Sequence, residues 1–97
     1  MKFEWDLKKE RINIKKHRVT FEQASYVFSD PFSLSMYDPD HSEDEDRYIL
    51  IGQSQNEVIL TVVHTFKDEN DIEVVRVISA RKATQKEGKL YQQRCPS

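Results

Sequence analysis

The spacing of hydrophobic and polar positions along the chain changes several times, and each change marks a predicted element. Apolar and polar side chains alternate over residues 2–5 and 32–36, which predicts two short strands. Longer strands are predicted at 47–51, 58–66 and 72–80, joined by polar connectors that include 53–57 and 67–71. The strand at 58–66 is apolar on both faces, so we expect it in the middle of an antiparallel meander, with helices covering at least one face.

The first predicted helix, residues 7–16, has only a weak apolar side. Leu7, Ile12 and Ile14 give only a weak apolar stripe. Most of the remaining surface is cationic, and the cluster at 15–18 lies at the C-terminal end, where positive charge is favourable against the helix dipole.

Capping boxes predict two further helices. Thr20 and Gln23 form the first box, and Asp30-Pro31 ends that helix because the residue before proline is disfavoured in the helical region. Thr84 and Glu87 form the second box, which begins a helix that runs to about residue 93. The face of the middle helix that we predict to be core consists of Phe21, Ala24, Val27 and Phe28.

These elements predict one α+β domain spanning residues 1–97, with an antiparallel sheet of about four strands, two N-terminal helices and one C-terminal helix. Its hydrophobic core must be small, because apolar residues make up 37% of the chain and charged residues 33%. We expect the tail at about 94–97 to be disordered. The chain has no apolar run of membrane-spanning length and no signal peptide, and its single cysteine, Cys95, agrees with a reducing compartment; we therefore expect it in the cytoplasm, away from membranes.

Charge is segregated along the chain, although the formal net charge is only -2. Residues 1–30 hold seven lysines and arginines against five acidic residues, and residues 76–97 hold six against one. The middle, residues 31–75, holds two against eleven. Such asymmetry suits one basic surface for a polyanion and a separate acidic surface for a basic partner, although a solvated mixed surface would give the same counts.

The strand at 72–80 is unusual because it carries Arg76 among β-branched residues and is followed by Arg81-Lys82. A buried cation is unfavourable unless it is paired or faces a groove. Arg76 could therefore reach out of an edge strand or pair with a carboxylate, or it could present a cation to a phosphate-rich ligand. Under strict alternation Arg76 and Arg81 emerge on opposite faces, so a shared site requires a bend or the edge of the sheet.

Two other groups of titratable residues have simpler interpretations. The loop at 37–46 is rich in aspartate, glutamate and histidine, but it lacks the glycine and the final glutamate of a calcium loop, so we favour a solvated loop over a metal site. His64 lies on an apolar side of its strand, where a hydrogen-bonded core histidine is favoured over a catalytic one.

Several segments of the chain together resemble the BrnT toxin family, from residue 3 to about residue 91. The most specific combination is the ISARKAT block with FEWD and the Lys-His pair. The segments are Phe3-Glu4-Trp5-Asp6, Lys16-His17, residues 19–24, Val27-Phe28, Asp30-Pro31, residues 38–42, Arg47, Gly52, residues 63–65 and residues 76–84.

This resemblance implies a toxin of a type II toxin–antitoxin system with a RelE-like ribonuclease fold. Members of the family cut RNA without a metal or other cofactor, and they arrest growth. A BrnA antitoxin with a DNA-binding domain holds them inactive, and the complex represses its own operon. The implied partners are therefore RNA, an antitoxin in a heterotetramer or other hetero-oligomer, and operator DNA contacted only through the antitoxin.

Metal-free cleavage by the RNA 2′-hydroxyl requires a base, an acid for the leaving oxygen, and cations that stabilise the phosphorane charge. Arginine suits the last role because its planar fork binds phosphate oxygens bidentately. The candidates for catalysis are Arg76, Arg81, His17, His64 and Lys16, with Glu87 and Tyr91 as weaker ones. The candidates for binding RNA phosphates are Lys15, Lys82, Arg47 and Lys86.

Two positions depart from the family pattern. Arg18 stands where the family commonly has glycine, and the connector 67–71 is acidic where relatives tend to be basic. An acidic rim would repel RNA, so a second interpretation stays open. In that interpretation the chain is a catalytically weak or inactive homologue that binds the antitoxin and assists repression of the operon.

Overall fold

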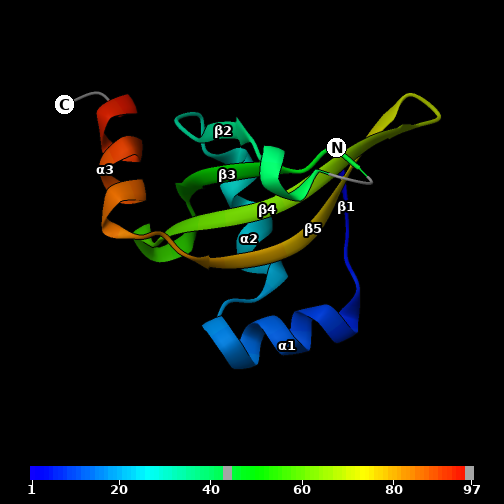
Figure 1. Ribbon diagram of the computed structural model, residues 1–97, viewed down its shortest axis with the longest axis horizontal. Coiled ribbons are helices and arrows are strands. Elements are labelled where there is room, and N and C mark those ends of the chain that lie inside the picture. The colour runs from blue at the N-terminus through cyan, green and yellow to red at the C-terminus, as the bar shows by residue number, and fades with distance from the viewer. Residues whose placement is uncertain (43–44, 96–97) are drawn as a thin grey trace.

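One five-stranded mixed sheet organises residues 1–42 and 45–95, the part of the chain that the computed structural model describes (Figure 1). Its order is β1-β5-β4-β3-β2, with β1 parallel to β5 and the other neighbours antiparallel. The strands are β1 (Lys2–Glu4), β2 (Leu34–Tyr37), β3 (Tyr48–Gln53), β4 (Ile59–Glu69) and β5 (Ile72–Lys82). The predicted central position of β4 is confirmed.

The predicted antiparallel sheet of about four strands is confirmed only in part, because β1 adds a fifth strand in parallel. Phe3 lies opposite Val75 of β5, and its ring packs edge-to-face on Phe28 with centroids 5.2 Å apart. The alternation at residues 2–5 predicts a strand, but it contains no local signal for a partner more than 70 residues away. The chain between β1 and β5, which includes α1, α2 and β2–β4, is long enough for the crossover that a parallel pair requires.

The predicted connector at 67–71 is too long, because residues 67–69 belong to β4. Glu69 pairs with Ile72, and the turn between them consists of Asn70 and Asp71 alone, with φ angles of 52° and 66°. These positive angles are those of a tight hairpin turn that suits asparagine and aspartate. The acidic segment is therefore the tip of a long β4–β5 arm that projects away from the helices (Figure 1).

Three α-helices flank the sheet: α1 (Leu7–His17), α2 (Phe21–Tyr26) and α3 (Gln85–Arg94). A 3-10 turn, η1 (Val27–Ser29), continues α2, and two more are η2 (Pro39–His41) and η3 (Gln55–Glu57). Both predicted capping boxes are present in full, at Thr20 and at Thr84. Arg94 ends α3 and its Nε donates to the carbonyl of Phe32, so the predicted disordered tail does not include it; residues 96–97 lie outside the described residues.

The predicted apolar stripe of α1 does not face the core. Leu7, Ile12 and Ile14 are 63%, 60% and 39% exposed, and the buried residue of the helix is Asn13. The Asn13 amide donates to the carbonyl of Ala80 over 2.8 Å and accepts from the Ala80 N–H over 3.1 Å. It also donates to the carbonyl of Val19 over 2.9 Å. Asn13 thus makes the backbone hydrogen bonds that a neighbouring strand would make, at the part of β5 that extends beyond β1. These polar contacts orient α1 against the sheet.

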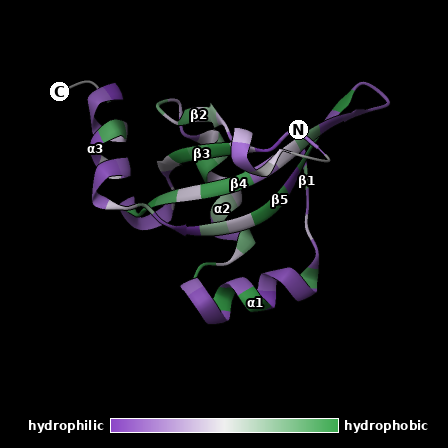
Figure 2. Cartoon of the chain, in the orientation of Figure 1, coloured by the Kyte–Doolittle hydropathy of each residue, from purple (hydrophilic) through white to green (hydrophobic). Residues whose placement is uncertain are grey.

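The hydrophobic core lies between one face of the sheet and α2 with η1. Figure 2 shows the hydrophobic residues gathered on the middle of the long strands, whereas α1 and α3 are mostly hydrophilic. The predicted core residues Phe21, Ala24 and Val27 are fully buried, and Phe28 packs against them. The remaining buried members are Val19, Leu50, Leu60, Val62, Val77 and Ala80.

Candidate functional site

A β-bulge in β5 places Arg76 and Arg81 on the same face of the sheet. His64 lies opposite Val77 and the preceding residue of β4, Val63, lies opposite Ser79, so Ile78 has no partner in β4. One extra residue shifts the alternation of side chains by one position. Arg76 is therefore opposite Thr65 and Arg81 opposite Thr61, two β4 residues whose side chains share a face. The bulge supplies the bend that a shared site requires.

We call this surface the arginine face and define it by six residues of β4 and β5. It is the side of the sheet opposite to the core, because Leu60, Val62 and Val77 point the other way. The six residues are Thr61, Val63, Thr65, Arg76, Ser79 and Arg81. Ser79 lies between the two arginines along β5, and no chemical motif in the sequence singles it out.

The C-terminal half of α1 borders the arginine face at the bulge. A hollow of about 200 Å³ separates the helix from β5, and its floor is formed by Ile78 and Ser79. Lys16 and His17 line it from the helix side, together with Lys9. Of the predicted residues, Lys16 and His17 therefore share a hollow with Ser79, while Arg76 and Arg81 lie on either side of Ser79 along β5.

Arg81 is held by Glu87 of α3. Its two terminal nitrogens donate to the two carboxylate oxygens over 2.7 and 3.0 Å. Glu87 also accepts from the Thr61 hydroxyl and from the Thr84 N–H, over 3.0 and 2.8 Å. The hydrogen bonds from Arg81, supported by those from Thr84 and Thr61, outweigh partial burial and lower the pKa of Glu87 to about 2. Glu87 is therefore ionised near neutral pH, and in this structure its carboxylate holds Arg81.

Arg76 is exposed and lies between two other strands. It is opposite Glu4 of β1 on one side and Thr65 of β4 on the other, and it borders a hollow with Trp5 and Asp6. Glu4 pairs instead with Lys67, over 3.2 Å, and Asp6 accepts from the N–H groups of α1. Within residues 1–42 and 45–95 the Arg76 side chain has no ion pair, so its guanidinium remains available to a ligand.

His64 lies in the core, as the interpretation of a core histidine predicts. The residue is 0% exposed, and its ring is surrounded by Phe28, Tyr48 and Phe66 with centroid distances of 4.8, 6.1 and 4.7 Å. Burial lowers the pKa of the imidazole to about 4. A ring enclosed in this way cannot touch RNA, so the alternative catalytic role for His64 is not compatible with the structure.

Tyr91, the weakest catalytic candidate, is a buried anchor of α3. Its hydroxyl donates to Asp30 over 2.6 Å, and burial together with this bond raises the pKa of the phenol. Asp30 also accepts from the N–H groups of Gln53 and Phe32. These contacts join α3 to β3 and to the end of η1, which gives Tyr91 a structural role.

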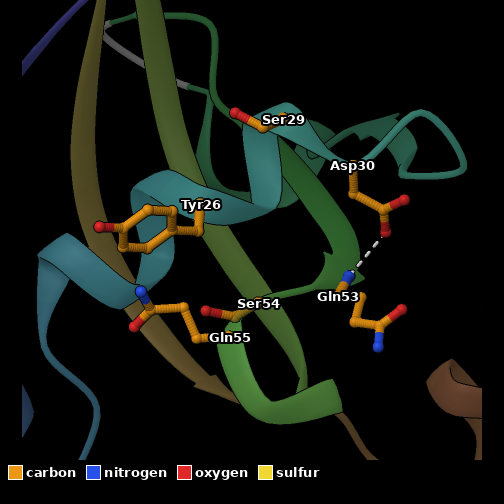
Figure 3. A pocket seen from close by; sticks show the side chains of 6 residues that line it. All are labelled: Tyr26, Ser29, Asp30, Gln53, Ser54 and Gln55. Carbon is orange, nitrogen blue, oxygen red and sulfur yellow. Dashed lines mark hydrogen bonds between the residues drawn. The ribbon is translucent and has the colours of Figure 1, made fainter.

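A hollow of about 280 Å³ beside Asp30 has the wrong charge for RNA (Figure 3). Asp30 is its charged residue, and in Figure 3 the carboxylate points to the backbone nitrogen of Gln53 that it binds. The other residues that line it are Tyr26, Ser29, Gln53, Ser54 and Gln55. A hollow without a cation offers no electrostatic attraction to a phosphate.

The four residues predicted to bind phosphates are spread over the molecule. Lys82 is opposite Leu60 and so lies on the core side of the sheet, away from the arginine face. Lys15 and Lys86 are exposed near the ends of α1 and α3. Arg47 precedes β3, where its backbone binds Asp38 and Ser42 and its Nε is buried.

Two further observations concern alternatives raised by the sequence. Among the described residues, which omit 43 and 44 of the acidic loop, no three His, Cys, Asp or Glu side chains are grouped so that they could hold a metal ion. None of the helices in the described part is long and apolar enough to cross a membrane.

Comparison with known proteins identifies a matching family and a similar solved structure. The family model described as "Ribonuclease toxin, BrnT, of type II toxin-antitoxin system" matches residues 5–87. The crystal structure of the Brucella abortus ribonuclease toxin, BrnT, is 30% identical and superposes with a TM-score of 0.58, covering 88% of this chain and 99% of that one. No match was found among curated proteins.

Proposed function

The chain belongs to the BrnT family of ribonuclease toxins of type II toxin–antitoxin systems, and from this premise we propose that it cuts RNA on the arginine face without a metal ion. The RNA 2′-hydroxyl attacks the adjacent phosphorus and expels the 5′-oxygen of the next nucleotide. This reaction needs two proton transfers and stabilisation of the negative charge on the phosphorane.

The observation that carries the proposal is the bulge that brings Arg76 and Arg81 to one face. Arg76 binds the scissile phosphate, because its guanidinium is exposed and forms no direct ion pair among the described residues, although the Asp6 carboxylate attracts it from nearby. Arg81 keeps N–H groups that do not bind Glu87, and Glu87 fixes the plane of its guanidinium. Lys16 adds a third cation from the border of the face.

His17 is our candidate for proton transfer. With His64 buried, it is the histidine that lines the hollow next to Ser79. His17→Ala should therefore lower kcat for RNA cleavage while the variant keeps its fold. Unchanged cleavage by the folded variant would eliminate His17 from the mechanism.

The toxin acts with partners in the cell. We propose that RNA cleavage in the cytoplasm inhibits translation and growth, and that the fold is RelE-like. A BrnA-type antitoxin neutralises the chain in a heterotetramer or other hetero-oligomer and supplies the contacts to operator DNA. These proposals rest on the family, whose printed description names a type II toxin–antitoxin system.

Induction of the chain alone in bacteria tests the central proposal. We expect growth arrest and cleaved cellular RNA, and Arg76→Ala should abolish both while the purified variant keeps its circular dichroism spectrum. Arg81→Ala leaves Glu87 without its partner, so it is best paired with Glu87→Gln. Lys89→Ala, at an exposed position of α3, is the matched control. Adequate expression without arrest or RNA cleavage would sink the proposal.

A second candidate function is a non-catalytic module that binds the antitoxin and assists repression. It is favoured by the acidic tip of the β4–β5 arm, where Asp68, Glu69, Asp71 and Glu73 are exposed. Such a tip repels RNA and could attract a basic partner. The induction experiment separates the two functions, because this module would not arrest growth yet would still increase operator binding by the antitoxin.

A further inference from the structure

A further hollow, of about 240 Å³, lies on the core side of the sheet, at the end where β5 leaves it. We call it the Arg18 hollow. The turn from α1 to α2 forms one wall, the β3–β4 connector forms another, and Lys82 closes it from β5. The residues that line it are Arg18, Val19, Gln23, Ser54, Gln55, Asn56, Val58, Leu60 and Lys82.

The lining of the Arg18 hollow combines three kinds of chemistry. Arg18 and Lys82 are cations, and no carboxylate is among the lining residues. Gln55 and Asn56 carry amides that can both donate and accept hydrogen bonds. Val58 belongs to the apolar surface, together with Val19 and Leu60. A nucleotide requires this combination, because its phosphate is anionic, its base has a flat apolar face, and the base edge carries donors and acceptors.

Arg18 occupies its place at a conformational cost. Its φ and ψ are 60° and 32°, the left-handed region that ends a helix and that favours glycine. For a residue with a Cβ atom this conformation costs about 1 kcal/mol or more. The fold does not need an arginine here, since the cap is the backbone N–H of residue 18 bonded to the carbonyl of Ile14.

The Arg18 hollow and the arginine face lie on opposite sides of the sheet, but residues that are adjacent in sequence link them. Arg18 follows His17 on α1, and Lys82 follows Arg81 on β5, where consecutive side chains point to opposite faces. Within the described residues β1 pairs only with residues 74–76 of β5, and Asn13 of α1 takes the place of a strand neighbour at Ala80. A single RNA strand can therefore pass around β5 only at the end of the strand, beyond Lys82, where it would meet cations on both sides.

We propose that the Arg18 hollow binds one nucleotide of the RNA that flanks the cleaved bond. Arg18 and Lys82 hold its phosphate, its base lies on the exposed side chain of Val58, and the amides of Gln55 and Asn56 contact the base edge. This proposal rests on the proposed function, because it assumes that RNA is cut on the arginine face. It assigns substrate selection to the opposite side of the same strand.

Arg18→Gly gives a sharp test because it removes the cation and relieves the backbone at the same time. The full chain carrying Arg76→Ala, which leaves RNA uncut, is titrated with a labelled single-stranded oligoribonucleotide at several salt concentrations. We expect Arg18→Gly and Lys82→Met each to weaken binding about tenfold and to lower the slope of log K against log salt by about 0.7. Lys89→Met should change neither quantity beyond a twofold difference.

Asn56→Gly tests base contact in the same way. Asn56 has a φ of 58°, which glycine adopts freely, so the variant loses only the amide. It should reduce the differences in affinity among the four homopolymeric oligoribonucleotides. Unaltered affinity of Arg18→Gly, or an equal loss in Lys89→Met, would overturn the nucleotide site.

Two other outcomes are also decisive. If Arg18→Gly binds the antitoxin more weakly but RNA normally, the hollow is an antitoxin contact and the proposal is wrong. If the parent chain cuts RNA and the Arg18→Gly enzyme cuts it with the same kcat/KM, the nucleotide site fails while the proposed function stands. A parent chain that neither binds nor cuts RNA refutes both.

Discussion

Arg81 and Glu87 form a bidentate ion pair in which the two guanidinium nitrogens lie 2.7 and 3.0 Å from the two carboxylate oxygens. The same carboxylate completes the capping box of α3 and accepts from Thr61 of β4. One side chain thus connects two strands and the start of a helix. Removal of the Glu87 carboxylate should therefore lower the stability of the fold and also change the orientation of Arg81.

Glu87→Gln should lower the free energy of unfolding at pH 7 by about 1–2 kcal/mol, because the pair is only partly shielded from solvent. The pKa of Glu87 is near 4.5 in the unfolded chain and about 2 in the folded one. Its stabilisation is therefore complete above pH 4.5 and is lost as the pH falls toward 2. Urea unfolding of the variant should show less acid destabilisation in this window. Glu4→Gln, which breaks an exposed pair with Lys67, should behave like the parent chain.

Asn13→Leu should destabilise the fold by about 2–4 kcal/mol, because it leaves the N–H and carbonyl of Ala80 and the carbonyl of Val19 without their partner. Thermal unfolding followed by circular dichroism measures the effect. Ile12→Ala on the exposed side of the same helix should change stability by less than about 0.5 kcal/mol. Equal losses in the two variants would mean that α1 docks through its apolar residues.

Arg18→Gly should raise the free energy of unfolding by about 0.5–1 kcal/mol, because glycine adopts the left-handed conformation without strain. The greater entropy of glycine in the unfolded chain offsets part of the gain. Arg18→Ala is the control, because it removes the charge but keeps the Cβ atom. Chemical denaturation should rank glycine above alanine, and the reverse order would show that residue 18 is not strained.

The two glycines of the chain should respond to alanine in opposite directions. A Cβ atom on Gly52 would lie 2.8 Å from Cγ1 of Val27 and 3.0 Å from Cβ of Ser33, so Gly52→Ala should destabilise the fold by about 1–3 kcal/mol. Gly88 of α3 has nothing within 4 Å of such an atom, and Gly88→Ala should stabilise the fold by up to about 1 kcal/mol. The midpoint of urea unfolding distinguishes the two signs, and a stabilised Gly52→Ala would contradict the close contact with η1.

The buried imidazole of His64 should make the fold sensitive to mild acid. Its pKa is near 6.5 in the unfolded chain and about 4 in the folded one, so stability is complete above pH 6.5 and falls as the pH drops toward 4. The total loss should be about 2–3 kcal/mol. His64→Leu should flatten stability across this window in urea titrations. The variant should also cleave RNA normally. Loss of cleavage in a folded variant would show that His64 takes part in the reaction.

The sequence predicted correctly those elements that depend on residues close together in the chain. The capping boxes at Thr20 and Thr84 and the core face of α2 are present as predicted, because each depends on residues within one or two turns. The sequence did not predict the orientation of α1, because a buried asparagine contributes no apolar periodicity, and its partner, Ala80, is 67 residues away. The pairing of β1 with β5 was missed for the same reason.

The candidate site stays a prediction, and the sequence indicated its residue types but not its geometry. Arg76 and Arg81 lie on either side of Ser79 along β5, and Lys16 and His17 share a hollow with it, but the sequence could not show that Glu87 holds Arg81 or that Lys82 lies on the other side of the sheet. Both facts depend on the strand register and on the path of the chain after β5. Ser79 and Asn56 have no signature of their own, and only their position next to other residues brings them into the argument.

The bulge at Ile78 makes the number of residues between two arginines as important as the arginines themselves. Consecutive side chains of a strand point to opposite faces of the sheet. Deletion of one residue between Arg76 and Arg81 would therefore move one guanidinium to the core face, although the residue itself is unchanged. An insertion would do the same. Toxicity in this chain could therefore be lost or regained through a change in length alone, while every cation that a sequence comparison would count remained in place.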